Sequence, residues 1–322
     1  MTVRVYRSSD ASAPVLTGQA GTLLAILDAC LVAGYGSNAA AGWTKPFVTA
    51  LNVAIYRPPM GNRRYLRIDD TTTTDARIHA FESMTSDTDF STSFTVGVFG
   101  AITSTTGLQL KKSSTADATT RGWVVIATQT AVYIFIEPTS IPAAWGSTST
   151  STSGNGQMFF GDFISYRPND AYNTALIGST SSSAGQGALG SISTSITTGA
   201  TGHVLTRNYL GLGSGGTLFH KGVPGLYSSL SVMGQASTSN PFPDVITGGI
   251  MLSQVEIGEI TSSAHIVRGR LPGVWAPITS LPASHGDVIE GTGIAAGKTL
   301  LTVAVWSTFT VGRMFIEISD TW

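Results

Sequence analysis

The sequence predicts an all-β protein, built mainly from antiparallel sandwich-like or barrel-like sheets, with one N-terminal α-helix near residues 18–33. Short apolar runs rich in β-branched and aromatic residues recur along the 322 residues, and Gly, Pro and Ser separate them. Charged residues make up only 11% of the chain, whereas glycine alone contributes 37 positions. A single run has apolar residues at helical spacing. Together these observations predict many short strands and one helix.

The helix is predicted where apolar side chains recur at intervals of three, four and seven residues. Thr17 or Thr22 could cap its first turn, because a threonine hydroxyl can accept a hydrogen bond from a free helical N–H. Gly34 is expected to end it, since glycine adopts the left-handed conformation that closes helices. The residues of the apolar face are Leu23, Leu24, Ile26, Leu27, Leu31 and Val32.

The predicted strands lie on both sides of a tract of Ser, Thr, Gly and Asn at 146–156. The two arms at 123–127 and 131–136 are expected to form a hairpin, because three polar residues separate them. The N-terminal strands are expected at 3–6, 53–57, 64–69, 76–81, 123–127 and 131–136. The C-terminal strands are expected at 158–166, 175–177, 203–205, 248–252, 254–257, 265–267, 299–306 and 313–318.

The tract at 146–156 is also the best candidate for a domain boundary. It would divide the chain into an N-terminal β domain with the helix (1–145) and a C-terminal β domain (157–322). A single large β domain is the alternative. We expect this tract and a second one at 179–202 to lie at subunit contacts, because segments so poor in apolar groups have little reason to order alone.

Composition argues against several classes of protein. A net charge of −1 without a basic tract argues against nucleic-acid binding. The single cysteine, Cys30, excludes an intramolecular disulfide framework and a zinc site made of cysteines, and we expect it to be a buried small hydrophobe. The N-terminus has no apolar signal segment and no run reaches the length of a membrane-spanning helix, so we expect no membrane association and folding in a cytosol.

No pattern for catalysis or for a cofactor stands out. No serine lies in a G-x-S-x-G motif, and the five histidines are scattered without metal-ligand spacing. Two G-x-G-x-x-G matches, at 185–190 and 211–216, lack the preceding strand and following helix of a dinucleotide site. We therefore expect a non-enzyme without a cofactor, metal or small-molecule substrate.

Several aspartates lie close together in the first third of the chain. Asp69, Asp70, Asp87 and Asp89, with Asp75, could bind a cation or face a sugar. Turn chemistry is the favoured interpretation, because Asp side chains accept hydrogen bonds from nearby backbone groups in turns. Ion binding by these residues stays open.

Aromatic and arginine residues at sites rich in Pro and Gly are the candidate interface residues. Trp43 and Trp275 are expected in loops, and Trp322 is the last residue of the sequence. Arg268 and Arg270 precede Trp275 in a segment, 268–277, that its prolines should keep extended and stiff. Each tryptophan could anchor a contact with another chain or fill a core of its own chain.

Four segments resemble a group of structural proteins from the virions of tailed bacteriophages. They are VRVYRSSDASAPVLTG at 3–18, LDACLVAGYG at 27–36 with AGWTKPF at 41–47, YLRIDD at 65–70, and RGRLPGVWAP at 268–277 near the closing DTW. The resemblance implies a virion component that is made and folded in the host cytoplasm and assembles with itself and with other virion proteins. Within that class we expect a structural protein of the tail, baseplate or neck. A capsid decoration or head-fibre protein is one alternative, and a tail appendage that binds or cleaves carbohydrate is another.

Overall fold

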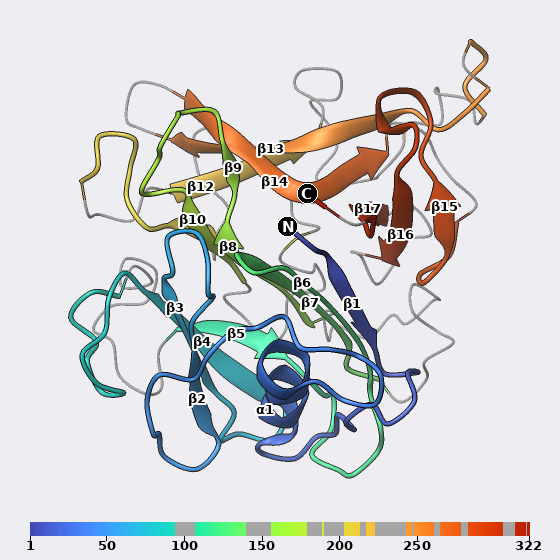
Figure 1. The fold of residues 1–322 in the computed structure, drawn as a ribbon. Coiled ribbons are helices and arrows are strands. Elements are labelled where there is room, and N and C mark those ends of the chain that lie inside the picture. The colour runs from blue at the N-terminus through green and yellow to red at the C-terminus, as the bar shows by residue number, and fades with distance from the viewer. Residues whose placement is uncertain are drawn as a thin grey trace.

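The structure, a computed structural model, is built mainly of antiparallel strands with one short helical segment, as the sequence predicts. Within the part of the chain it describes, the strands form a large sheet and a separate four-stranded sheet (Figure 1). The described residues are 1–93, 107–139, 156–178, 189, 203–212, 217–222, 243–246, 248–260, 265–277, 283–304, 313–319 and 321–322.

The four-stranded sheet is a simple antiparallel series in the order β2-β3-β4-β5. Its strands alternate in the way expected of a sheet with two different faces. Leu66 and Ile78 point into the main core, while Arg67 and His79 pair across the opposite face. The strands are β2 (Val53–Tyr56), β3 (Tyr65–Asp69), β4 (Asp75–Phe81) and β5 (Leu108–Lys111).

The large sheet runs in the order β1-β6-β7-β8-β10-β11-β12-β13-β14-β17-β16-β15, and β9 pairs with β14 beside this path. Most neighbours in the sheet are also neighbours in sequence. The exception at its start is β1, which pairs with β6, so the whole four-stranded sheet is inserted between two adjacent strands. The first strands are β1 (Arg4–Arg7), β6 (Gly122–Ala127), β7 (Ala131–Glu137), β8 (Gly156–Asp162), β9 (Ile164–Ser165), β10 (Thr174–Ile177) and β11 (His203–Leu205). The remaining strands are β12 (Thr217–Gly222), β13 (Leu252–Ile260), β14 (His265–Pro277), β15 (Val288–Glu290), β16 (Thr299–Ala304) and β17 (Arg313–Glu317).

Strands β6, β7 and β8 form the middle layer of the molecule and are buried on both faces. One face packs against the helix and the four-stranded sheet, through residues such as Ile134 and Phe160. The other face packs against β13, β14, β16 and β17, through residues such as Tyr133 and Phe159. Burial on both faces explains why these strands are continuous apolar runs instead of alternating ones.

The helix is shorter than the predicted span of 18–33. Regular α-helix α1 covers Thr22–Leu27, and Asp28–Ala33 continues it as a π-helical turn that Gly34 ends with φ 84°. Neither predicted threonine caps it, because the Thr22 hydroxyl donates to the carbonyls of Thr17 and Gln19. Asp70, far away in the sequence, accepts a hydrogen bond from the Leu23 N–H at 2.9 Å in their place.

Strands β13 and β14 form a long hairpin across the top of the view in Figure 1. Two bulges interrupt its register, one of them between Gln254 and Glu256, and Gly273 in β14 has φ 68°. The Trp322 indole lies so close to Gly273 that a Cβ there would stand 2.3 Å from Trp322 Nε1. The expectation that 268–277 is extended is confirmed, but Trp275 lies within a strand and the loop predicted for it is wrong.

Most predicted strands coincide with observed ones, and the predicted hairpin of β6 and β7 is confirmed. The sequence does not predict β5, β12 or β15, because β5 and β12 have few β-branched residues and β15 is only three residues long. The domain boundary at 146–156 stays a prediction; β7 and β8, which lie on either side of it, pair directly in the large sheet. The tracts at 146–155 and 179–202 (apart from Leu189) and nearly all of the two glycine-rich matches lie outside the described residues.

Candidate functional site

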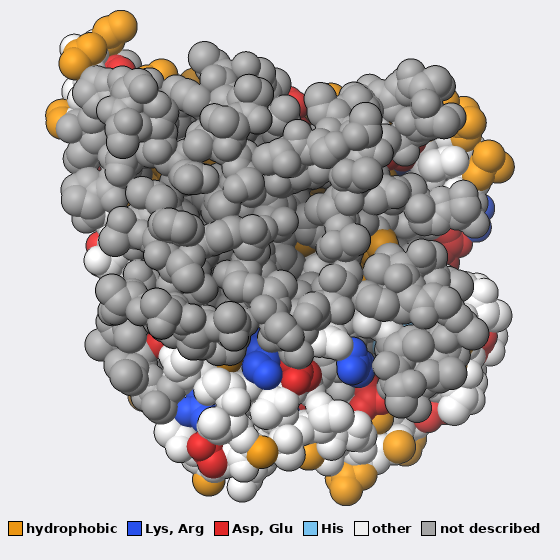
Figure 2. Space-filling model, turned by 180° about the vertical axis from the view of Figure 1, so that it is seen from behind, with side chains coloured by type: hydrophobic (Ala, Val, Ile, Leu, Met, Phe, Trp, Pro, Cys, Tyr) orange, Lys and Arg blue, Asp and Glu red, His pale blue; other side chains and the backbone are white. Residues whose placement is uncertain are grey.

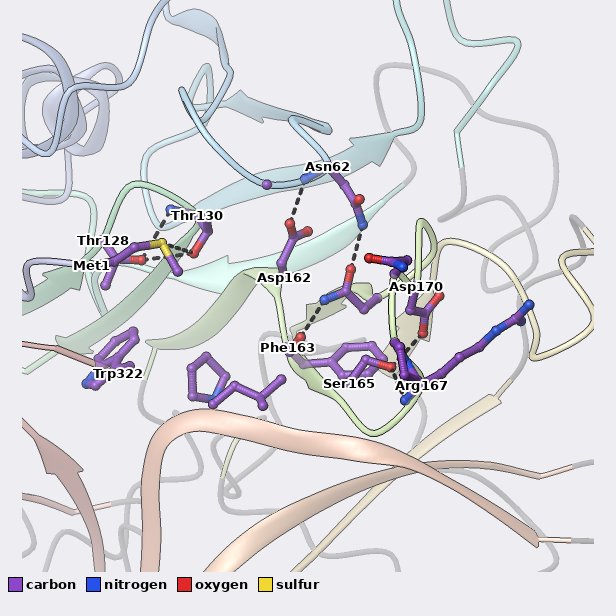
Figure 3. A pocket seen from close by; sticks show the side chains of 16 residues that line it. Met1, Asn62, Thr128, Thr130, Asp162, Phe163, Ser165, Arg167, Asp170 and Trp322 are labelled. Carbon is purple, nitrogen blue, oxygen red and sulfur yellow. Dashed lines mark hydrogen bonds between the residues drawn. The ribbon is translucent and has the colours of Figure 1, made fainter.

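A cleft of about 460 Å³ opens where the turn between β2 and β3 meets the end of β8, strand β9 and the middle of β14 (Figure 3). Clefts of this size are typical of sites for small ligands. Both ends of the given chain reach it, since Thr2 and Thr321 form a β-bridge and the termini lie side by side in Figure 1. Its main polar and aromatic lining residues are Asn62, Thr130, Asp162, Asp170, Asn173 and Trp322.

The Asp162 carboxylate, at the end of β8, holds the turn between β2 and β3 against the large sheet. Asp162 Oδ2 accepts a hydrogen bond from the Asn62 N–H at 2.7 Å, and Asp162 Oδ1 accepts one from the Thr174 hydroxyl. Gly61 leaves room for this contact, because a Cβ there would stand 2.1 Å from Asp162 Oδ2. Burial raises the pKa of Asp162, and its hydrogen bonds oppose that shift.

The amide side chains of Asn62 and Asn173 continue this network along the wall of the cleft. Asn62 Nδ2 donates to Asn173 Oδ1 at 2.7 Å, and Asn173 Nδ2 donates to the Phe163 carbonyl at 2.6 Å (Figure 3). Bonds of this length fix both amides in one orientation. The wall therefore offers a preorganised row of polar groups to a ligand.

Asp170 belongs to a buried ionic cluster behind the same wall. Its carboxylate lies 3.1 Å from the Arg268 guanidinium, which also reaches Glu259 at 2.7 Å. Burial alone would raise the pKa of Asp170, but hydrogen bonds from the Tyr172 N–H, the Ser165 hydroxyl and Arg268 together hold that pKa below its usual value. The Asp170 side chain is only 1% exposed.

Glycoside hydrolysis requires two carboxyl groups that face each other across the sugar, and Asp162 and Asp170 are the two carboxyl side chains that line the cleft. Both oxygens of Asp162 and of Asp170 already accept hydrogen bonds from groups of the protein. Each aspartate thus helps to hold the wall of the cleft in place.

Three of the predicted interface residues come together in a second, smaller cavity of about 80 Å³. Arg270, Trp275 and Trp322 line it together with Lys298 and Glu317. Arg270 donates to the Gln254 side chain, and Lys298 pairs with Glu317 at 2.7 Å. The Trp322 indole is half-buried and donates to the Glu317 carbonyl at 2.8 Å.

The other two predicted interface residues lie elsewhere, inside the chain. Trp43 is 2% exposed, packs edge-on against Phe160 and donates its indole N–H to the Thr128 carbonyl at 2.8 Å. Arg268 is the buried centre of the cluster with Asp170 and Glu259. Trp43 therefore fills the core of its own chain, the alternative that its sequence context left open, and a contact of these residues with another chain stays a prediction.

The aspartates in the first third of the chain separate into different environments. Asp89 accepts hydrogen bonds from the N–H and hydroxyl groups of Thr85 and Ser91, as turn chemistry predicts. Asp69 pairs with Arg67 at 3.3 Å, and Asp70 pairs with Lys112. Within the described residues, no three His, Cys, Asp or Glu side chains gather as a metal site would require.

Sequence reasoning missed the contacts that join the two sheets around the cleft. Arg207 binds both oxygens of Glu82, at 2.6 and 2.7 Å, and Arg64 donates to the Ala171 carbonyl at 3.0 Å. No local sequence pattern predicts these contacts, because the partners lie more than a hundred positions apart.

Comparisons with known proteins add no relative. A scan against models of protein families found no match, and a search of curated proteins found no similar sequence. Among the described helices, none is long and apolar enough to cross a membrane.

Proposed function

We propose that this chain is a structural component of a tailed-bacteriophage virion, placed in the tail, baseplate or neck region. It would be made and folded in the host cytoplasm and act through repeated contacts with copies of itself and with other virion proteins. The four segments that resemble such proteins support this proposal. The large sheet, whose middle layer is sealed on both faces, suits a rigid building block.

The observation that carries the proposal is a set of large aliphatic side chains that stand exposed at loop tips. Val48 is 97% exposed and Leu51 is 85% exposed in the loop before β2, and Val245 and Ile246 are 81% and 90% exposed before β13. Hydrophobic side chains also stand out at the upper corners and the lower rim of the face shown in Figure 2. Apolar side chains exposed to this degree at loop tips are available for contacts with other molecules.

A chain with so few charges suits repeated contacts between identical copies. In a symmetric assembly each contact recurs in every copy, so a pair of like charges at an interface would be repeated as well. Uncharged Ser and Thr side chains avoid that repulsion and still hydrogen-bond. A capsid decoration or head-fibre protein would follow the same logic and remains the alternative within this class.

The cleft favours a second candidate function, a tail appendage that binds carbohydrate. The fixed amides of Asn62 and Asn173 and the Trp322 indole, which line the cleft together, are the kinds of group that orient a polyhydroxylated ligand. A glycan array probed with the purified protein would test it, with Asn62→Ala as the variant that should lose binding. Binding by both proteins alike, or by neither, would reject the cleft as a carbohydrate site.

Immunolabelling of purified virions tests the leading proposal. An antibody raised against this chain should mark the tail, baseplate or neck in negative-stain images. Label on the head would favour the decoration alternative. If neither labelling nor mass spectrometry detects the chain in purified particles, the proposal is refuted.

A further inference from the structure

Lys112 and Asp70 form an ion pair that is sealed completely inside the protein. Both side chains are 0% exposed, and Lys112 Nζ contacts Asp70 Oδ1 and donates to the Gln19 carbonyl at 2.7 Å. Among the lysine–carboxylate pairs of the described residues, this is the one in which neither side chain reaches solvent. The neighbouring Lys111, for comparison, lies 3.6 Å from Asp75, and those side chains are 15% and 18% exposed.

The second oxygen of the Asp70 carboxyl group faces backbone donors at the start of α1. Asp70 Oδ2 accepts a hydrogen bond from the Leu23 N–H at 2.9 Å, and the Leu24 N–H also bonds to this carboxyl. When a nucleophile adds to a carboxyl carbon, negative charge develops on its oxygen. Fixed N–H donors that already point at that oxygen stabilise the charge without further rearrangement.

Burial favours the neutral forms of both partners. It raises the pKa of Asp70 and lowers the pKa of Lys112, and in each case this effect outweighs the attraction between them. The neutral amine is the nucleophilic form of lysine, and the protonated carboxyl group is the form that can lose water. The contact between Lys112 Nζ and Asp70 Oδ1 also brings Nζ near Cγ, the atom that it would attack, because Oδ1 is bonded to Cγ.

We propose that Lys112 and Asp70 join in an intramolecular isopeptide bond. Lys112 Nζ attacks Asp70 Cγ, the bond from Cγ to Oδ1 breaks, and Oδ1 leaves as water. In the neutral pair, two protons lie on Nζ and one lies on the carboxyl group. Two of these three protons depart with the water, and the third stays on the amide nitrogen, where it can donate to the Gln19 carbonyl. No oxidant or other reagent is needed.

Such a bond would be a covalent cross-link within the chain, which a disulfide cannot provide here. The single cysteine excludes an intramolecular disulfide, whereas the proposed bond links positions 42 residues apart and ties the end of β3 to the end of β5. It would also replace two buried ionisable groups, whose charged forms are costly to desolvate, with one neutral amide. A virion part exposed outside the cell would gain resistance to unfolding from that tie.

Mass spectrometry of the purified, folded protein tests the proposal directly. The intact mass should be lower than the sequence mass by one water molecule. Trypsin should yield a branched peptide that joins residues 68–77 to residues 112–121, because acylated Lys112 is no longer cleaved. An intact mass equal to the sequence mass, with the two peptides separate, would overturn the proposal and leave an ordinary buried ion pair.

Two variants at adjacent lysines control the result. Lys112→Arg keeps the positive charge but should abolish both the loss of water and the branched peptide. Lys111→Arg should retain both, because Lys111 pairs with Asp75 on a partly exposed site. If the branched peptide persists in Lys112→Arg and disappears in Lys111→Arg, the bond is formed by Lys111. That result would refute the proposed bond between Lys112 and Asp70.

Discussion

Replacing Trp275 with alanine should destabilise the isolated subunit strongly, because the ring fills a core of its own chain. Trp275 is 3% exposed and belongs to a buried cluster with Leu252, Leu300 and Phe315. Its indole nitrogen has no hydrogen-bond partner among the residues that the structure describes, so the expected loss is one of packing. Truncation of a buried tryptophan to alanine costs about 3–5 kcal/mol.

For a chain of this length, that loss corresponds to a fall in melting temperature of about 4–7 °C. Differential scanning calorimetry of the free subunit measures it, and a parallel experiment follows incorporation of the variant into particles. Trp275→Phe is the matched control, since it keeps an aromatic ring in the same cluster and should lose clearly less. A Trp275→Ala subunit that melts within about 1 °C of the parent but fails to enter particles would refute the core assignment and make Trp275 an interface anchor.

Three further predictions concern the exposed tips and the buried charges. Val245→Ser combined with Ile246→Ser should change the stability of the subunit by less than about 0.5 kcal/mol and reduce its incorporation into particles; equal incorporation would remove this tip from the assembly surface. Burial raises the pKa of Glu137 from 4.5 to about 7, so the folded state binds a proton more tightly than the unfolded one and stability should fall as pH rises through that window, by at most about 3 kcal/mol. Thermal unfolding measured across this pH range should show a weaker dependence of stability on pH for Glu137→Gln than for the parent protein. The same dependence in both proteins would contradict the raised pKa of Glu137. Arg268→Ala leaves two buried carboxylates without their cation and should cost about 3–5 kcal/mol in chemical denaturation, whereas Arg270→Ala, half-buried beside Gln254, should cost clearly less; equal losses would count against the cluster.

The sequence predicts the parts of this fold that depend on neighbouring residues. The hairpin of β6 and β7 follows from two β-rich runs and a short polar turn, and the hydrogen bonds of Asp89 join residues no more than four positions away. Gly34 ends the helical segment as expected, because its left-handed φ is a local property.

Features that depend on distant residues could not be predicted in this way. The cap of α1 comes from Asp70, 47 positions from its partner Leu23, and the indole of Trp43 finds its acceptor 85 positions away. The cleft is assembled from the turn at 61–62, the end of β8, Pro272 and both ends of the given chain. Hydrophobic periodicity describes which face of a strand is buried, but it does not say which strands meet.

The insertion of β2–β5 between β1 and β6 has a consequence for folding during synthesis. The later strands mostly pair with strands made just before or after them, so hairpins can form as the ribosome releases the chain. Strand β1 emerges before β6, but Arg7 pairs with Val124, which lies 117 positions later, so β1 must wait for its partner to be synthesised. At roughly 5–20 residues per second, β1 stays unpaired for on the order of 6–25 seconds. Arg4 and Arg7, the charged residues at its two ends, help to keep the unpaired strand from forming a sheet with another nascent chain.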